Sequence, residues 1–280
     1  MKYTRNEFLK LTGLGISGAA AVAVTSSFTD NTGNAPKDLQ LKLGLASYTL
    51  RALSLDETIR ITKKLGLTSI SLKSMHMPLE SSPADIKKMA EKVRSAGIDL
   101  YAAGVIYMKT KQEVDTTFAY AVNAGLNMIV GVPNHDLLQY VEEQVKKTDI
   151  KLAIHNHGPG DTLYQSPDDV YAKIKDLDHR IGFCIDIAHV QRIGQDPSAM
   201  LLRYKDRLLD MHMKDVIKDE KDAGPIEIGR GMIDIPKVVK TLKKIKYQGY
   251  VAFEYEKDEK DPIPGLAESV GYTRGIMKLT

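Results

Sequence analysis

Several features that narrow the class of a protein are scarce in this chain of 280 residues. It has no tryptophan and a single cysteine, Cys184, which excludes an intrachain disulfide. Outside residues 1–34, 36 basic residues face 34 acidic ones, and they form neither a basic stripe nor a polybasic patch. We therefore expect neither nucleic acid nor a stable membrane association once the N-terminal segment is removed.

The one long apolar run lies at the N-terminus. Three basic residues among the first ten precede an apolar, small-residue stretch from Leu11 to Val24. This order is typical of a secretory signal peptide, and the run is shorter than the ~20 residues that a membrane span needs. We predict a signal peptide over 1–28, a linker over 29–38 and an exported, periplasmic protein. Thr4–Lys10 resembles a twin-arginine export motif with Asn6 in place of its second arginine, and an uncleaved membrane anchor is the alternative.

Residues 39–280 alternate short apolar runs with amphipathic stretches eight times. Strict alternation of strands and helices indicates a parallel sheet, and eight units in this length favour one α/β domain, a (β/α)8 TIM barrel. Ser82-Pro83 and Ser166-Pro167 each place an N-cap serine before a proline at the first helical position. The expected strands are 41–47, 68–73, 98–105, 127–132, 150–155, 181–186, 207–213 and 249–255. The expected helices are 54–65, 83–96, 111–124, 136–147, 167–177, 197–204, 235–246 and 264–279.

Histidines and carboxylates gather at the ends of the later strands. The positions are His155 and His157 at the fifth strand, Asp186 and His189 at the sixth, His212 and Lys214 at the seventh, and Glu254 and Glu256 at the eighth. The carboxyl ends of barrel strands converge on one face, where active sites lie. Inward-facing polar groups there need each other, water or a metal, because an unpaired buried charge is costly.

A metal site is the interpretation we test. His155, Asp186, His212 and Glu254 form a mixed set of nitrogen and oxygen ligands for one divalent ion. Such a set suits Zn, Mn, Co or Fe. Mg fits it less well, because Mg is a poor partner for imidazole ligands.

Other polar residues have two open interpretations. Lys73 on the second strand either lies inside the barrel mouth, where it can bind an oxyanion or transfer protons, or is an exposed strand-end lysine. Gly229-Arg-Gly231 with Asp234 is either a phosphate cradle or, for Asp234, a helix N-cap. Surface or salt-bridged positions are expected for the remaining groups, His135, His179, Asp215 and Glu256.

Three stretches resemble the xylose isomerase-like TIM barrel superfamily, over about residues 41–279. They are Cys184–His189, Met211–Asp215, and Gly229–Asp234 followed by Phe253-Glu254. In relatives such as tagatose epimerase and hydroxypyruvate isomerase, the matching residues bind a divalent metal. The resemblance therefore implies that Asp186, His212 and Glu254 are ligands, that His189 touches substrate, and that the substrate is a small carbohydrate.

One position departs from that pattern. Many epimerases of this group carry a glutamate on the fifth strand as ligand and base, whereas this chain has His155. The stretches Leu152–His157 and Glu254–Glu256 also resemble inosose dehydratase, which removes water from a keto-cyclitol. The departure thus leaves two reactions open.

The first reaction is isomerisation or epimerisation of a sugar or keto-sugar. Glu254 or His155 would remove the proton next to the carbonyl and form an enediolate, with the metal as Lewis acid. His189 and Lys214 would orient hydroxyls, and Lys73 would stabilise oxyanion character.

The alternative is a lyase or hydratase acting on a keto-sugar or 3-keto-glycoside at the same metal site. The enediolate would then expel a leaving group, and His157, His76 or Lys73 would be the acid that assists its departure. A non-catalytic sugar-binding barrel or an apurinic-site nuclease comes last, because a nuclease needs more ligands and a basic groove that the sequence does not show.

Overall fold

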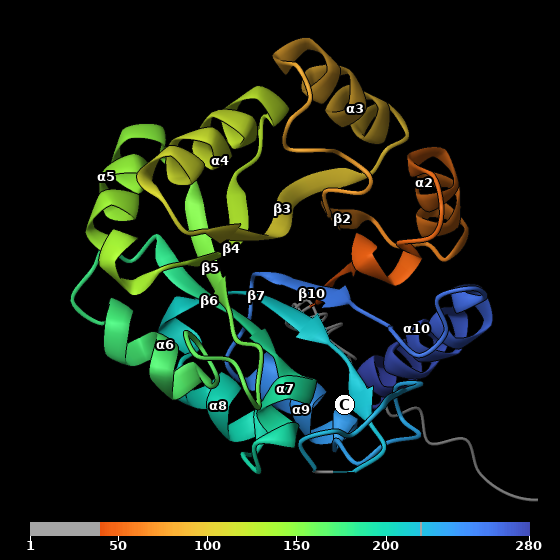
Figure 1. Cartoon of the computed structure of the whole chain (residues 1–280). Helices are drawn as coiled ribbons and strands as arrows, with labels where there is room; N and C mark the ends of the chain where they lie inside the picture. The colour runs from red at the N-terminus through yellow and green to blue at the C-terminus, as the bar shows by residue number, and fades with distance from the viewer. Residues whose placement is uncertain (1–39, 219) are drawn as a thin grey trace, which may run out of the picture. The chain divides into compact units, whose positions relative to one another are not determined.

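A computed structural model describes residues 40–218 and 220–280. Eight parallel strands close into a barrel, with helices around the outside (Figure 1). The hydrogen-bonded order around the barrel is β1-β10-β7-β6-β5-β4-β3-β2, which confirms the predicted (β/α)8 TIM barrel. The strands are β1 (Lys42–Ala46), β2 (Ser69–Leu72), β3 (Asp99–Met108), β4 (Met128–Pro133), β5 (Lys151–His155), β6 (Ile181–Asp186), β7 (Leu208–Met213) and β10 (Tyr250–Phe253).

The helices bury one apolar stripe each against the barrel. In α9, for example, Ile235, Val238 and Leu242 recur at helical spacing and are buried. Ser82 and Ser166 cap α3 and α6 as predicted, because each hydroxyl accepts the backbone N–H three residues later. The α-helices are α2 (Leu55–Lys64), α3 (Pro83–Ser95), α4 (Lys111–Ala124), α5 (Leu138–Thr148), α6 (Pro167–Ile174), α7 (Ile187–Arg192), α8 (Pro197–Arg203), α9 (Ile235–Lys244) and α10 (Pro262–Leu279).

Three regions differ from the sequence prediction. The short helix α7 begins directly after β6, because Asp186 is its N-cap and accepts the backbone N–H groups of Ala188 and His189 at 2.9 and 3.0 Å. A two-stranded antiparallel hairpin, β8 (Asp215–Val216) with β9 (Pro225–Ile226), follows β7. Strand β3 continues to Met108, three residues beyond its predicted end.

The strand register positions the candidate site. Asp186 on β6 lies directly beside His212 on β7, and His212 lies beside Ala252 on β10. Glu254 follows one residue after β10 and shares the face of Ala252, because side chains alternate along a strand. His155 ends β5, the other neighbour of β6. The four predicted ligands therefore come from neighbouring strands at one mouth.

None of the helices in residues 40–218 and 220–280 combines the length and the apolar character that crossing a bilayer requires. The predicted signal peptide and linker lie outside these described residues.

Candidate active site and metal-binding cluster

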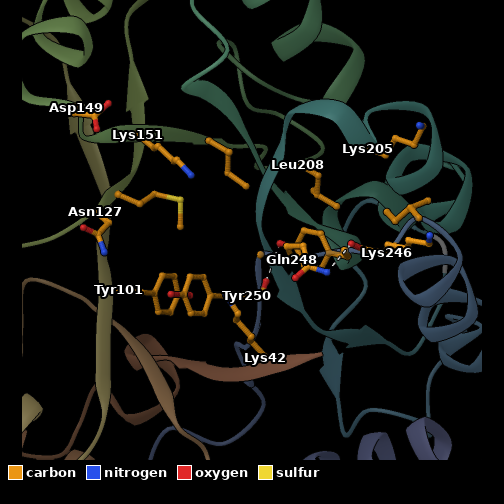
Figure 2. Close-up of a pocket in the computed structure, with 15 residues that line it drawn as sticks. Lys42, Tyr101, Asn127, Asp149, Lys151, Lys205, Leu208, Lys246, Gln248 and Tyr250 are labelled. Atoms are coloured by element: carbon orange, nitrogen blue, oxygen red, sulfur yellow. Dashed lines mark hydrogen bonds between the residues drawn. The ribbon is translucent and has the colours of Figure 1, made fainter. Parts of the chain in front are cut away.

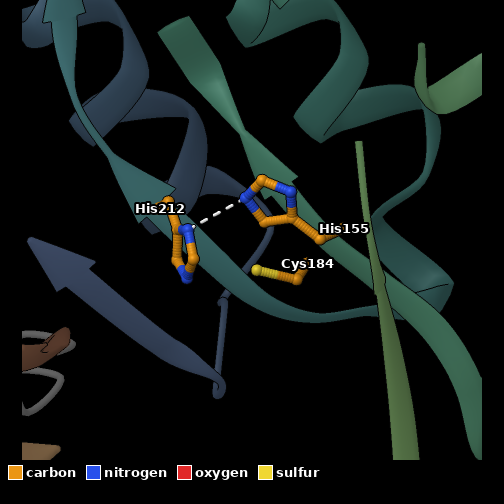
Figure 3. Close-up of side chains that lie close together, drawn as sticks. All are labelled: His155, Cys184 and His212. Carbon is orange, nitrogen blue, oxygen red and sulfur yellow. Dashed lines mark hydrogen bonds between the residues drawn. The ribbon is translucent and has the colours of Figure 1, made fainter. Parts of the chain in front are cut away.

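Four buried side chains converge at the carboxyl-terminal mouth of the barrel. His155, Asp186, His212 and Glu254 each offer one ligand atom, and these atoms all lie within 4.8 Å of one another. His155 Nε2 is 3.0 Å from His212 Nδ1 (Figure 3), and that Nδ1 is 2.9 Å from Glu254 Oε2. The structure thus brings together the four residues that we predicted as ligands.

The donor set fits a divalent cation. Two imidazoles and two carboxylates provide the mixture of nitrogen and oxygen that zinc, manganese and cobalt accept. Within the described part of the chain, Asp186 Oδ2 and Glu254 Oε1 are buried oxygens that accept no hydrogen bond of good geometry. Buried polar atoms are rarely left in this state, and coordination of a cation would satisfy both.

Asp186 is held so that only one of its oxygens is available to the cluster. Its Oδ1 caps α7, which leaves Oδ2 directed at the histidines. Asn156 fixes the backbone of the same residue, since its Oδ1 accepts the Asp186 N–H at 3.0 Å and its Nδ2 donates to the Asp186 carbonyl at 3.3 Å. This support restricts the ligand to one orientation.

Lys214 brings a buried positive charge into the cluster. Its ammonium nitrogen lies 2.9 Å from Asp186 Oδ2, 2.7 Å from Glu254 Oε2 and 3.2 Å from Glu256 Oε2, and its side chain is only 5% exposed. Glu256 is therefore salt-bridged, one of the two situations expected for it. Lys214 contacts the carboxylates themselves rather than facing open space for a substrate hydroxyl.

Lys73 lies inside the mouth rather than on the outer surface. Its ammonium is 3.3 Å from Glu254 Oε1 and 5.1 Å from the centre of the Tyr48 ring. This is the placement in which a lysine can exchange a proton with substrate.

Burial and charge pairing set the protonation states. Burial lowers the pKa of His155 well below its usual value, so this imidazole is neutral at neutral pH. Burial also raises the pKa of Asp186 and of Glu254, but charged neighbours, Lys214 among them, outweigh it and bring both well below the ordinary carboxyl range. The pKa of Lys214 is raised well above its usual value, because the two carboxylates outweigh the effect of burial.

Two further histidines stand at the rim. His157 Nε2 is 3.0 Å from the Tyr107 hydroxyl, and its Nδ1 is 3.7 Å from Asp161 Oδ2. His189, on α7, places Nε2 3.8 Å from Asp186 Oδ2. Tyr107 is 48% exposed and was missed by the sequence interpretation, because β3 was expected to end before it. The only available signal was its aromatic side chain just past a strand.

Our interpretation of His76 as a possible acid is wrong. His76 is buried, and both of its ring nitrogens have partners outside the cluster. Nδ1 is 2.9 Å from Ser47 Oγ, and Nε2 is 3.0 Å from Thr58 Oγ1. These partners come from the segment after β1 and from α2, so His76 joins two separate parts of the fold.

The phosphate-cradle interpretation of the glycine-rich turn is also wrong. The backbone N–H groups of Gly229 and Gly231 donate to Asp215 Oδ2 at 2.9 and 3.1 Å, so they are not free for an anion. Asp215 is buried and organises this loop through backbone N–H groups, contrary to the solvated or salt-bridged position expected for it. Asp234 is the N-cap of α9, the other interpretation, and accepts the Lys237 N–H at 2.9 Å.

The remaining histidines lie apart from the cluster. His179 is exposed, as expected, and half-buried His135 is 2.9 Å from the Leu163 carbonyl through Nε2.

Cys184 lies beside the two histidines (Figure 3) and forms an alternative three-residue group with them. Burial raises the pKa of its thiol well above the usual value. Its sulfur lies 3.8 Å from Asp210 Oδ2, to which the thiol donates. Because metals bind the thiolate, a neutral thiol engaged with Asp210 is the weaker candidate ligand.

A cavity of about 570 Å³ opens at the opposite, amino-terminal mouth (Figure 2). Its floor includes stacked Tyr101 and Tyr250, whose ring centres are 3.7 Å apart. Asp149, the acidic residue in its lining, is bonded to Arg180 at 2.8 Å. The rim carries four lysines, Lys42, Lys151, Lys205 and Lys246. This cavity has no convergent acid–base pair, so we place the candidate chemistry at the other mouth.

Comparison with known proteins gives partial matches to a rhizopine catabolism protein and to inosose dehydratases. MocC, a rhizopine catabolism protein of Rhizobium meliloti, is 26% identical over 145 residues, which are 46% of this chain and 44% of that protein. Inosose dehydratase of Clostridium beijerinckii is 27% identical over 146 residues, 46% of each chain. The chain therefore spans about half the length of the curated relatives it matches.

A solved structure and a family model cover more of the chain. The crystal structure of IolI protein with a bound zinc atom superposes with a TM-score of 0.71 at 16% identity, covering 85% of this chain and 99% of that one. At this identity the likeness shows the fold alone. Residues 135–276, slightly more than half of the chain and including all four clustered ligands, match the model of the xylose isomerase-like TIM barrel. The chain therefore belongs to the xylose isomerase-like TIM barrel family.

Proposed function

We propose that the protein is a divalent-metal-dependent lyase that acts on a keto-sugar or keto-glycoside. It removes the proton next to the carbonyl and then expels a leaving group from the adjacent carbon. The observation that carries this proposal is the 3.3 Å separation between Lys73 Nζ and Glu254 Oε1, which sets an acid beside a base. Neighbouring acid and base groups suit the loss of hydrogen and leaving group from one face of the substrate.

The metal would be held by His155, Asp186, His212 and Glu254. A divalent ion bound there would act as a Lewis acid toward the substrate carbonyl and make the adjacent proton easier to remove. Asn156 and the α7 cap keep the Asp186 carboxylate oriented for this role.

The protein groups complete the proton balance. Glu254 Oε1 takes the proton from the carbon beside the carbonyl, and the electrons of that C–H bond form the enediolate. The enediolate re-forms the carbonyl as the C–O bond to the leaving group breaks and a carbon–carbon double bond appears. Lys73 gives a proton to the departing oxygen and regains one from Glu254. The products are an unsaturated ketone and water or an alcohol.

Rim residues would bind the sugar hydroxyls. His157, held between Tyr107 and Asp161, and His189 on α7 face the mouth with polar ring atoms. Their roles are to orient the substrate so that its leaving group points toward Lys73, because a small misplacement of reacting atoms costs much of the rate.

Isomerisation or epimerisation is the second candidate. His155 and Glu254 approach the cluster from β5 and the end of β10, so two bases flank the same space. An epimerase could use them on opposite faces of the enediolate. The partial sequence matches to inosose dehydratases support elimination instead, which is why we place the lyase first.

The two candidates differ in the mass of their products. The protein is incubated with keto-sugars and 3-keto-glycosides in deuterated water, and the products are weighed by mass spectrometry. We expect loss of water or of the aglycone. Products that keep the substrate mass and only gain deuterium would replace the lyase by the epimerase.

We also propose export to the periplasm, on the basis of the N-terminal basic and apolar pattern. N-terminal sequencing of periplasmic protein should find a start between about Val24 and Lys37. A full-length chain confined to the cytoplasm would contradict export.

A further inference from the structure

We propose that Lys214 is an internal counter-cation that competes with a divalent metal for Asp186 and Glu254, and that Glu256 receives its ammonium when the metal binds. The inference rests on the metal dependence of the proposed function. It concerns a residue for which the sequence suggested only the orientation of substrate hydroxyls.

The contacts place Lys214 among the ligand oxygens. Its ammonium lies within 2.9 Å of an oxygen on each of Asp186 and Glu254, and both carboxylates are buried. Asp186 Oδ2 is also one of the oxygens that accept no well-formed hydrogen bond in the described part of the chain. The lysine therefore lies at the oxygen that a metal would also bind, and charge rather than a well-formed hydrogen bond holds it there.

The charges nearly balance without a metal. Three carboxylates, those of buried Asp186 and Glu254 and of partly exposed Glu256, face the two ammonium groups of Lys214 and Lys73. Adding a divalent ion changes the net charge of this group from −1 to +1. A glutamate in place of His155 would offset that excess, but this chain does not carry one. The excess disfavours the metal unless one ammonium moves away.

Glu256 can pair with the Lys214 ammonium when a metal displaces it. Its Oε2 is already 3.2 Å from Lys214 Nζ, and at 30% exposure the carboxylate reaches toward solvent. A short movement of the flexible lysine side chain toward Glu256 would keep its charge paired and release the two ligand carboxylates. The pair then works as a switch between an ammonium-filled and a metal-filled cluster.

A different role for Lys214 predicts the opposite result. If the lysine stayed in place and oriented the two carboxylates for the metal, its removal would weaken metal binding by about 10- to 100-fold, as loss of such support typically does. Competition predicts that removal strengthens binding. The sign of the change therefore decides between the two roles.

The experiment measures zinc and manganese affinity of the full chain by competition with a chromophoric chelator. Lys214→Met should bind each metal about tenfold or more tightly than the unaltered protein. Glu256→Gln should bind more weakly, because the displaced ammonium loses its partner. Lys257→Met is the matched control with unchanged affinity, since Lys257 pairs with Glu227 outside the cluster.

Thermal unfolding provides a second measurement that does not depend on activity. Without metal, Lys214→Met should melt at a lower temperature than the unaltered protein, because two buried carboxylates lose a counter-charge. Saturating zinc should raise its melting temperature by more than it raises that of the unaltered protein. Circular dichroism at low temperature checks that the variant is folded, and Glu256→Gln tests the same switch if it is not.

The outcomes separate this inference from the proposed function. Equal or weaker metal binding by Lys214→Met, with metal bound to the unaltered protein, would overturn the counter-cation role alone. Absence of metal from both proteins would overturn the metal dependence and the switch together. Tight binding only in Lys214→Met would support the counter-cation role and contradict metal dependence of the natural chain.

Discussion

The same eight strands reach both mouths of the barrel, yet the two mouths are lined by different chemistry. At the carboxyl ends, four buried ligand atoms lie within 4.8 Å of one another and two ammonium groups pair with them. At the amino ends, a cavity of about 570 Å³ is rimmed by exposed lysines over a tyrosine stack. The cavity at the amino ends thus lacks convergent acid–base groups, and we place the candidate chemistry at the carboxyl ends, where such side chains converge.

A buried layer separates the two mouths. Asp210 on β7 accepts the Tyr101 hydroxyl at 3.2 Å and the Cys184 thiol, and burial raises the pKa of this carboxyl to about 7. Tyr101 lines the amino-terminal cavity, while Cys184 lies beside His155 and His212 of the cluster. The barrel interior is therefore polar near both mouths. Among residues 40–218 and 220–280, the metal-binding cluster at the carboxyl-terminal mouth holds two carboxylates together. Substitutions at each mouth test this contrast.

The largest effect should come from Asp186→Ala. Loss of this ligand should remove bound metal and activity while the barrel stays folded, because the change leaves the apolar core intact. Elemental analysis and circular dichroism measure the two properties. Asp186→Asn is the control for the lost α7 cap, since its amide oxygen can still accept the backbone N–H groups. Stoichiometric metal in Asp186→Ala would contradict the ligand set.

Lys73→Met should be next in size. Elimination should fall by about 10²- to 10⁴-fold, the usual contribution of a positioned acid. Exchange of the proton beside the carbonyl with solvent deuterium should persist, because Glu254 remains. Product mass and deuterium content are followed in the same samples. Lys42→Met, which removes a lysine from the other mouth, should leave both rates unchanged.

His155→Glu tests the choice between the two reactions. If epimerisation is the reaction, the added carboxylate should maintain or increase it by completing a pair of bases with Glu254. If elimination is the reaction, the rate should fall, because extra negative charge weakens the pull of the metal on the carbonyl oxygen. The ratio of mass-conserved to mass-reduced products measures the effect. Faster elimination would contradict our assignment of the cluster charge.

The sequence was enough to predict the eight-stranded barrel, because apolar runs, proline positions and N-cap serines are local signals. It also placed the four candidate ligands at one mouth, because strand alternation and a common strand direction determine which side chains meet. Helix α7 was not predicted, because it has only six residues and depends on Asp186 as its cap. His76 was misplaced because its partners, Ser47 and Thr58, come from segments whose proximity only the fold creates.

Lys214 shows the same limit at the site itself. Alternation predicted that it faces inward with His212, but not that its ammonium would reach the two carboxylates. The length and flexibility of a lysine side chain allow many end points, and only the packed neighbours select one. The inward direction of the Lys214 side chain was therefore predictable from the sequence, whereas its ion pairs with Asp186 and Glu254 were not.

Tyr250→Phe at the amino-terminal mouth should have the smallest effect. Its hydroxyl donates to Asp99 Oδ2 at 2.8 Å, near the surface, while the ring stacks on Tyr101. The change keeps the stack and removes one hydrogen bond, so the free energy of unfolding should fall by about 1 kcal/mol or less. Urea denaturation measures that loss, and metal affinity and product formation should match those of the unaltered protein. A large loss of metal affinity or of product formation would mean that the amino-terminal cavity is coupled to the metal-binding cluster through Tyr101, Asp210 and Cys184. The two mouths could then no longer be treated as independent.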